Sequence, residues 1–303
     1  MKSENGLAIF VSWLRRKPHI LNVLLFSLTF LFTLVIGLQF HITFYAIAIP
    51  GVQNLFQLIA ARPASLLWGL PYSLSLMAIL LVHELGHFMA CRRHHIRATW
   101  PYFIPAPTLV GTFGAFIKIQ SPFPSKKALF DVGVAGPVAG FFVALPIIAI
   151  GIHHSRIIEA QTLEAGITLG EPLVFQLFTL LVKGPLPADQ DILIHPIAFA
   201  GWFGLLATAF NLFPIGQLDG GHILYSLLGK KSRHVALAAI AAIVLLGIFF
   251  WQGWLFWALI VTFIGLRHPP IYEDEVIDRR RKVWAAVALI IFILSFTPAP
   301  ISF

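Results

Sequence analysis

Long apolar stretches, separated by short polar segments, dominate the pattern along this chain. Runs of 18 or more apolar residues with few charges are typical of transmembrane helices, whereas a membrane barrel would alternate apolar and polar positions. The pattern predicts an all-α polytopic membrane protein of six to seven helices, most consistent with seven, at about residues 19–44, 65–91, 130–152, 195–218, 234–250, 252–267 and 283–298. A further apolar run, residues 171–183, is too short to cross about 30 Å of hydrocarbon, so it is expected at the interface or against the bundle.

The polar connections between these runs are short. The longest on the outer side, about residues 153–194, is too short to hold an inserted globular domain. We therefore expect residues 1–303 to form a single integral-membrane domain.

Composition supports the membrane assignment. Only 11% of the residues are charged, against about 25% in a typical soluble domain. The formal net charge of +8 could suggest nucleic-acid binding, but the basic residues fall in short clusters between apolar runs. With the N-terminus inside, 18 of the 21 Lys and Arg residues lie on the inner side, as the positive-inside rule requires. We expect no nucleic-acid partner.

One of the predicted helices contains a metal-binding pattern. His83, Glu84 and His87 form an H-E-x-x-H element at the end of an uncharged run. Residues four apart share a helix face, so both imidazoles can bind one Zn²⁺, while Glu84 can serve as general base and acid toward a zinc-activated water. An unpartnered Glu in a spanning helix costs at least ~2.5–3.5 kcal/mol, so a chance match is the weaker interpretation.

A catalytic zinc ion needs a third protein ligand. Asp219, in the segment "NLFPIGQLDGGH", is the only acidic residue between Asp191 and Glu273. Asp219 precedes the inner-side residue Lys230 by 11 residues, and His83 precedes the inner-side residue Arg92 by 9. If these segments are helical, Asp219 and His83 both lie about 13–16 Å from the inner face. Asp219 could also cap the helix that follows, since Asp is a favoured N-cap, and the two roles are compatible. His222 is the rival ligand.

These motifs resemble the site-2 protease family of intramembrane zinc metalloproteases, in the compact type without PDZ or CBS domain. "HELGH" in one span, "GVAGPVAG" in a central span and "NLFPIGQLDGG" in a later one carry the resemblance, which covers about residues 65–230, the expected catalytic core. It implies that His83, His87 and Asp219 bind one zinc ion and that Glu84 is the catalytic acid/base. Asn211 matches a motif asparagine that assists near the substrate, although it could equally brace a broken helix.

Residues 108–120 are a further candidate element. Gly111 and Gly114 lie among β-prone residues, and "AFIKI" alternates in a way that suits a short strand. In the resembling family this region forms a re-entrant β-hairpin, whose edge could pair with an extended substrate. A loop on the inner surface is the alternative.

The favoured function is an intramembrane zinc metalloendopeptidase that hydrolyses membrane-spanning substrates, in the manner of regulated intramembrane proteolysis. Family resemblance implies single-span membrane proteins or signal-peptide remnants as substrates within the lipid bilayer. We expect a prokaryotic plasma membrane, a cytoplasmic N-terminus and an active site toward the cytoplasm. The alternatives are a zinc-binding transporter or sensor without protease activity, and another type of H-E-x-x-H membrane peptidase, for which a downstream Glu would be the expected third ligand.

Overall fold

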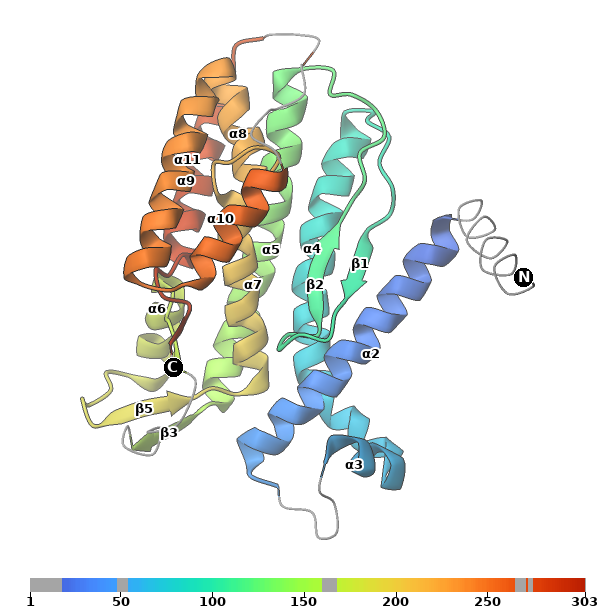
Figure 1. Ribbon diagram of the computed structural model, residues 1–303, viewed down its shortest axis with the longest axis vertical. Helices are drawn as coiled ribbons and strands as arrows, with labels where there is room; N and C mark the ends of the chain where they lie inside the picture. The colour runs from blue at the N-terminus through green and yellow to red at the C-terminus, as the bar shows by residue number, and fades with distance from the viewer. Residues whose placement is uncertain (1–17, 48–53, 160–167, 265–270, 272–274, 303) are drawn as a thin grey trace.

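The computed structural model describes residues 18–47, 54–159, 168–264, 271 and 275–302. Helices lie side by side in a bundle, and a β-hairpin runs along one of them (Figure 1). In chain order the elements are α2 (Pro18–Tyr45), α3 (Leu55–Ala61), η1 (Pro63–Gly69), α4 (Leu70–Arg93), β1 (Tyr102–Pro105), β2 (Thr112–Phe116), α5 (Lys126–His154), β3 (Arg156–Glu159), β4 (Thr168–Leu169), α6 (Leu173–Lys183), β5 (Gln190–Leu193), α7 (Pro196–Leu212), α8 (Asp219–Leu228), η3 (Gly229–Lys231), α9 (Ser232–Phe249), α10 (Gly253–Ile264), α11 (Arg279–Ser295) and β6 (Ile301–Ser302).

The helices support the prediction of a helical membrane protein. Among the described residues, four helical stretches are long and apolar enough to cross a membrane: His19–Tyr45, Pro63–Arg93, Lys126–His154 and Asp219–Phe249. The helices α6, α7 and α10 are apolar but shorter. Each of the seven predicted ranges holds a helix, but length and composition support four spans rather than all seven. Residues 265–267, the end of the predicted sixth span, lie outside the described residues.

The β-hairpin lies further toward the N-terminus than predicted. Its strands β1 and β2 are antiparallel, with Tyr102 opposite Phe116 and Phe103 opposite Ala115. Only β2 falls inside the predicted range of 108–120. Pro101 precedes β1 and Pro105 is its last residue, and these prolines conceal its strand pattern. Two small antiparallel pairs, β3 with β5 and β4 with β6, were not predicted at all. The fold is therefore mainly α rather than all-α.

Side chains of α2 and α4 hold the hairpin in place. The Asn22 amide donates hydrogen bonds to the carbonyls of Trp100 and Pro101, each at 2.9 Å, just before β1 begins. The buried Tyr72 hydroxyl donates to the carbonyl of Val110 at 2.9 Å, in the loop between the strands. The hairpin is thus fastened at both ends of its length to neighbouring helices.

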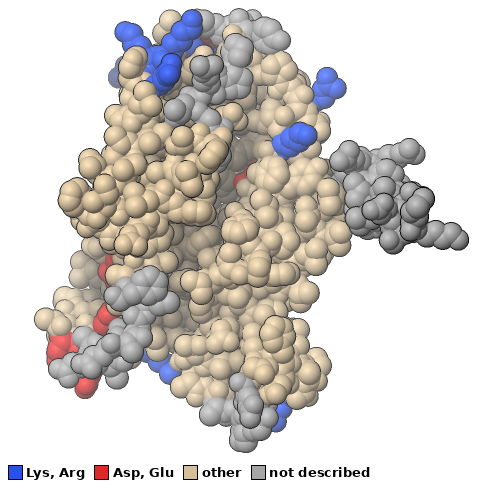
Figure 2. All heavy atoms as spheres, viewed as in Figure 1, with Lys and Arg blue, Asp and Glu red and all other residues tan. Residues whose placement is uncertain are grey.

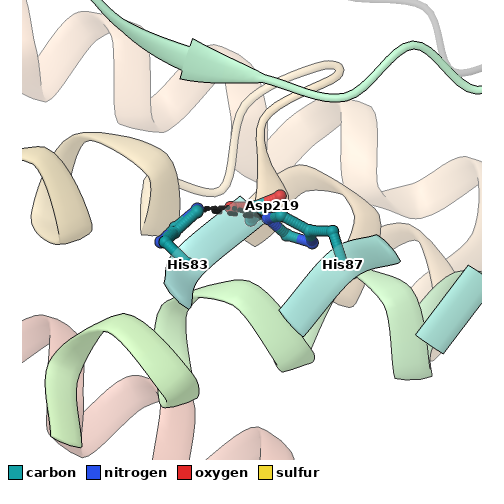
Figure 3. A group of neighbouring side chains, drawn as sticks. All are labelled: His83, His87 and Asp219. Atoms are coloured by element: carbon teal, nitrogen blue, oxygen red, sulfur yellow. Dashed lines mark hydrogen bonds and ion pairs between the residues drawn. The ribbon is translucent and has the colours of Figure 1, made fainter. Parts of the chain in front are cut away.

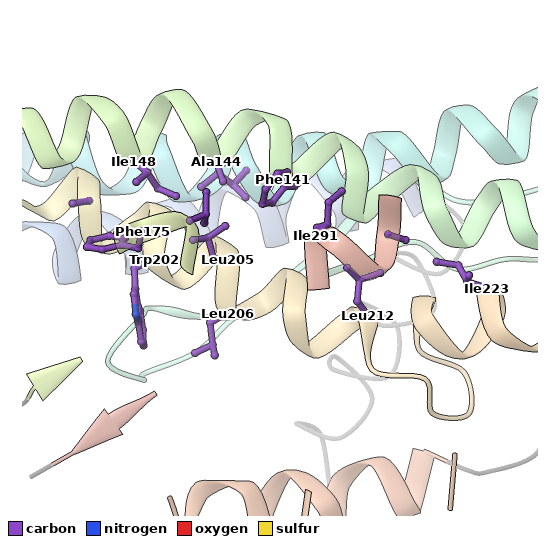
Figure 4. Close-up of a cluster of buried hydrophobic side chains, with 14 of the residues drawn as sticks. Phe141, Ala144, Ile148, Phe175, Trp202, Leu205, Leu206, Leu212, Ile223 and Ile291 are labelled. Carbon is purple, nitrogen blue, oxygen red and sulfur yellow. The ribbon is translucent and has the colours of Figure 1, made fainter. Parts of the chain in front are cut away.

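The core of the bundle forms where α4, α5 and α7 meet. Its buried side chains include Ile148, Trp202 and Leu205 (Figure 4). Glycines permit the close approach: a Cβ on Gly151 would lie 2.2 Å from the backbone nitrogen of Ala198. Small residues at helix contacts are the usual means of packing helices tightly in membranes. This packing brings the polar residues of α4 next to α5 and the end of α7.

Candidate metal centre

Two histidines of α4 point to one side of the helix, toward the end of α7. His83 and His87 are both 6% exposed, and Glu84 is 5% exposed. Their spacing of four residues places the two imidazole rings one turn apart, with ring centroids separated by 4.8 Å. The α4 helix therefore supplies two neighbouring nitrogen donors in a buried position.

A break in the helical chain brings Asp219 to these histidines. The α7 helix ends at Leu212, and the chain turns through Pro214 and Gly216, whose φ of +52° favours glycine. Asp219 is then the first residue of α8. The turn is tight because Gly220 follows: a Cβ there would lie 2.0 Å from the carbonyl oxygen of Leu212.

The Asp219 carboxylate faces the histidines rather than the helix end. Leu218 is the N-cap of α8 and makes no side-chain capping bond, so the predicted capping role of Asp219 is wrong. Within the described residues, the group that could hold a metal ion consists of His83, His87 and Asp219, without the rival His222.

The three donor atoms converge on one point (Figure 3). The Nε2 atoms of His83 and His87 are 3.1 Å apart, and Asp219 Oδ2 lies 3.4 Å and 3.3 Å from them. A tetrahedral Zn²⁺ with bonds of about 2.0–2.1 Å separates its ligand atoms by about 3.3 Å. The nitrogen and oxygen donors present therefore fit one zinc ion in both type and spacing.

The ring of His87 is fixed from behind by α5. Its Nδ1 lies 2.7 Å from the carbonyl oxygen of Val132, and since a carbonyl only accepts, Nδ1 must carry the proton. In the neutral ring Nε2 then carries a lone pair aimed at the other two donors, which is the usual arrangement for a metal-binding histidine. Residue Gly136 makes room for the ring, because a Cβ there would lie 2.1 Å from Nε2.

Glu84 lies beside the three donors and close to the hairpin. It lines a cavity of about 190 Å³ together with the three candidate ligands and residues 115–117. The carboxylate is therefore at the edge of a space large enough for a water and part of a substrate.

The predicted assisting residue Asn211 reaches the same place. Its Nδ2 lies 3.4 Å from His83 Nε2, from the last turn of α7. Glu84 and Asn211 also line a second cavity of about 170 Å³, whose other walls include the apolar side chains of Leu80, Phe203 and Trp257. When His83 Nε2 binds a metal, the Asn211 amide is free to donate to another acceptor.

Sequence reasoning missed one group at this site, the backbone carbonyl of Val132 that holds the His87 ring. No residue type marks a backbone carbonyl. The one relevant sequence feature was the "GVAGPVAG" motif. It predicts a close approach between helices, and this approach brings α5 against the histidines. A Cβ on Gly140 would lie 3.1 Å from the Cβ of His83, as that motif leads one to expect.

Comparisons with known proteins agree with this geometry. The family model described as "Peptidase family M50" matches residues 71–252. The protein named "Probable zinc metalloprotease EGY1, chloroplastic" from Arabidopsis thaliana is 32% identical over 265 residues, which is 84% of this chain and 46% of that protein. Its namesake from Oryza sativa subsp. japonica is 36% identical over 172 residues, 54% of this chain and 29% of that protein. "Probable zinc metalloprotease EGY2, chloroplastic" from Arabidopsis thaliana is 28% identical over 243 residues, 78% of this chain and 43% of that protein. The chain thus spans less than half the length of these curated relatives.

Proposed function

Because the chain belongs to peptidase family M50, the site-2 protease family that its motifs resemble, we propose that it is an intramembrane zinc metalloendopeptidase. The observation that carries the proposal is the convergence of His83, His87 and Asp219 beside a buried Glu84. These residues lie within two of the four candidate membrane-crossing stretches, Pro63–Arg93 and Asp219–Phe249, so the expected substrate is a peptide within or near the membrane.

In this proposal His83, His87 and Asp219 hold the zinc ion. A bound zinc ion supplies Lewis-acid polarisation of the scissile carbonyl and a water whose pKa is lowered to about 7. Glu84 accepts the proton of the attacking water and delivers it to the leaving amide nitrogen. The Asn211 amide N–H donates a hydrogen bond to the oxyanion that develops on the carbonyl oxygen.

The substrate must be extended at the point of cleavage, because helical amides are shielded by neighbouring turns. The strand β2 pairs with β1 along one edge, and the residues that follow β2 line the cavity with Glu84. We therefore propose that the substrate adds to β2 as a further strand, which supplies partners for the backbone groups released from its helix. A side chain next to the scissile bond would enter the apolar cavity beside Leu80 and Trp257.

The location and orientation are part of the proposal. Most of the visible Lys and Arg side chains lie toward one end of the molecule, and acidic atoms are visible in a hollow nearer the middle (Figure 2). A cytoplasmic position for the basic end follows from the positive-inside rule. The printed names of the plant relatives assign those proteins to chloroplasts, so they give no support to a prokaryotic plasma membrane.

Proteolysis and zinc content, measured on the same preparations, test the proposal. The full chain is reconstituted in vesicles with a panel of single-span substrates, and cleavage is compared between the wild type, Glu84→Gln and the charge control Glu171→Gln. We expect Glu84→Gln to keep its zinc and lose at least about 10²-fold in cleavage rate, the contribution of a general base. The control should match the wild type.

The same preparations separate the alternatives. Full cleavage by Glu84→Gln would exclude Glu84 as the base. Zinc flux into vesicles by a wild-type chain that cleaves no substrate would instead favour the transporter.

A further inference from the structure

A second kind of cavity lies apart from the metal donors. It has a volume of about 730 Å³ and lies between α4, α5 and the start of α11. Along α5 it extends from Phe130 to Val138, a length of about 12 Å at 1.5 Å per residue. We call this cavity the α4–α5–α11 groove.

The walls of the groove are largely apolar and open to the surroundings. Met89 is 66% exposed and Trp284 is 37% exposed, and both line it. Val134 and Val138 of α5 form the opposite wall. In a membrane-spanning bundle this surface faces lipid, and a Trp near the end of a helix is typical of the interface with the headgroups.

One end of the groove carries charge, and both of its carboxylates are paired with Arg281. Asp131 accepts hydrogen bonds from Arg281, with an Nε–Oδ1 distance of 2.8 Å, and lies 2.8 Å from Nε2 of His94. Asp278 also pairs with Arg281. This network joins α4, α5 and α11 and leaves no free carboxylate among the described residues that line the groove.

Two arginines at the same end remain available. Arg93 and Arg280 line the groove and are exposed. Neither guanidinium group has a hydrogen bond or ion pair within the described residues. An apolar groove that ends in two guanidinium groups without a described partner is complementary to a ligand with a long apolar part and an anionic head. Arginine binds phosphate oxygens through paired N–H donors, so the head is best matched by a phosphate.

We propose that the α4–α5–α11 groove binds an anionic phospholipid. Its phosphate contacts Arg93 and Arg280, and the first part of one acyl chain lies against Met89, Val138 and Trp284. Basic pockets between transmembrane helices are known sites for anionic headgroups. The lipid would stabilise the packing of α11 against α4 and α5 at the end where the Asp131–Arg281 network already joins these helices.

Lipid retention tests this proposal without reference to proteolysis. The full chain is reconstituted with equal amounts of phosphatidylglycerol and phosphatidylcholine, extracted into detergent, and its bound lipids are counted by native mass spectrometry. We expect phosphatidylglycerol to be retained over phosphatidylcholine. In the double variant Arg93→Gln/Arg280→Gln, its affinity should fall about 30-fold, since each interfacial basic residue contributes about 1 kcal/mol.

A matched control removes the same charge from the same end of the molecule. Lys231 and Arg233 are exposed and do not line the groove, so Lys231→Gln/Arg233→Gln should retain phosphatidylglycerol like the wild type. Equal losses in the two double variants, or equal retention of both lipids by the wild type, would overturn the proposal. So would displacement of the lipid by soluble glycerophosphoglycerol at similar concentration, because the acyl chain would then contribute nothing.

Discussion

The replacement of Gly136 by Ala gives a sharp test of the metal centre. The added Cβ would lie 2.1 Å from His87 Nε2 and 2.5 Å from both carbon atoms next to it, whereas ordinary contacts begin at 3.4 Å. The ring would have to retreat by roughly 1.3 Å along this direction, while its Nδ1 is held at 2.7 Å from the Val132 carbonyl. A zinc–nitrogen bond tolerates deviations of only about 0.2 Å.

The expected magnitude follows from this displacement. Loss of an outer hydrogen-bond partner of a ligand weakens metal binding by about 10- to 100-fold. Displacement of the ligand itself should exceed that range, so we expect zinc affinity to fall by more than about 100-fold, or about 2.7 kcal/mol. The helix α5 cannot simply move away, because Gly140 packs against His83 and Gly133 against the Asp219 segment.

Zinc content and thermal unfolding of the purified chain, measured together, provide the assay. Gly151→Ala is the matched control on the same helix: its Cβ would lie 2.2 Å from the nitrogen of Ala198, far from the metal ligands in sequence. The control should unfold at a lower temperature but keep its zinc. If Gly136→Ala binds zinc like the wild type, or if both variants lose it equally, ligand displacement is not the cause.

Four further outcomes are expected. Asp219→Ala should abolish stoichiometric zinc binding and cleavage, whereas His222→Ala should retain zinc, as measured by metal analysis. Dialysis against a chelator should remove activity and Zn²⁺ should restore it, with Glu84→Gln showing no recovery. Tyr72→Phe removes a buried hydrogen bond to the hairpin loop and should lower the free energy of unfolding by about 1 kcal/mol, as read from denaturant titration. Burial, assisted by nearby His154, His41 and Arg156, lowers the pKa of His195 to about 4 from 6.5. As pH falls from 6.5 toward 4, the unfolded chain therefore binds a proton at His195 that the folded chain does not. The free energy of unfolding should decline over that pH range. The variant His195→Gln should show a smaller decline.

Much of the site could be anticipated from sequence because its signals are either local or tied to membrane depth. The spacing of His83 and His87 fixes a shared helix face without any tertiary information. Asp219 could be matched to the histidines because, in a membrane-spanning segment, the number of residues from the inner face gives the depth in the membrane. The structure brings the Asp219 carboxylate to 3.3–3.4 Å from the Nε2 atoms of both histidines. Depth in the membrane thus related two distant segments, and the sequence of a soluble protein contains no comparable information.

The parts of the site and fold that the sequence did not predict depend on backbone groups and on short strand pairs, and neither produces a recognisable sequence pattern. His87 is oriented by the backbone carbonyl of Val132, which any residue could provide. The strand β1 is only four residues long and ends in Pro105, so its composition is that of a loop. The pair β4–β6 joins two-residue strands from distant parts of the chain, where tertiary contact rather than propensity decides the structure.

The origin of the third donor has a consequence for how the protein is made. The histidines come from α4, and Asp219 follows 132 residues after His87, once α5 and α7 have been synthesised. During translation and membrane insertion the chain therefore passes through a long interval in which only two donors exist. The metal centre is completed only when α8 has packed against α5. An ion that requires all three donors can therefore bind only at that point.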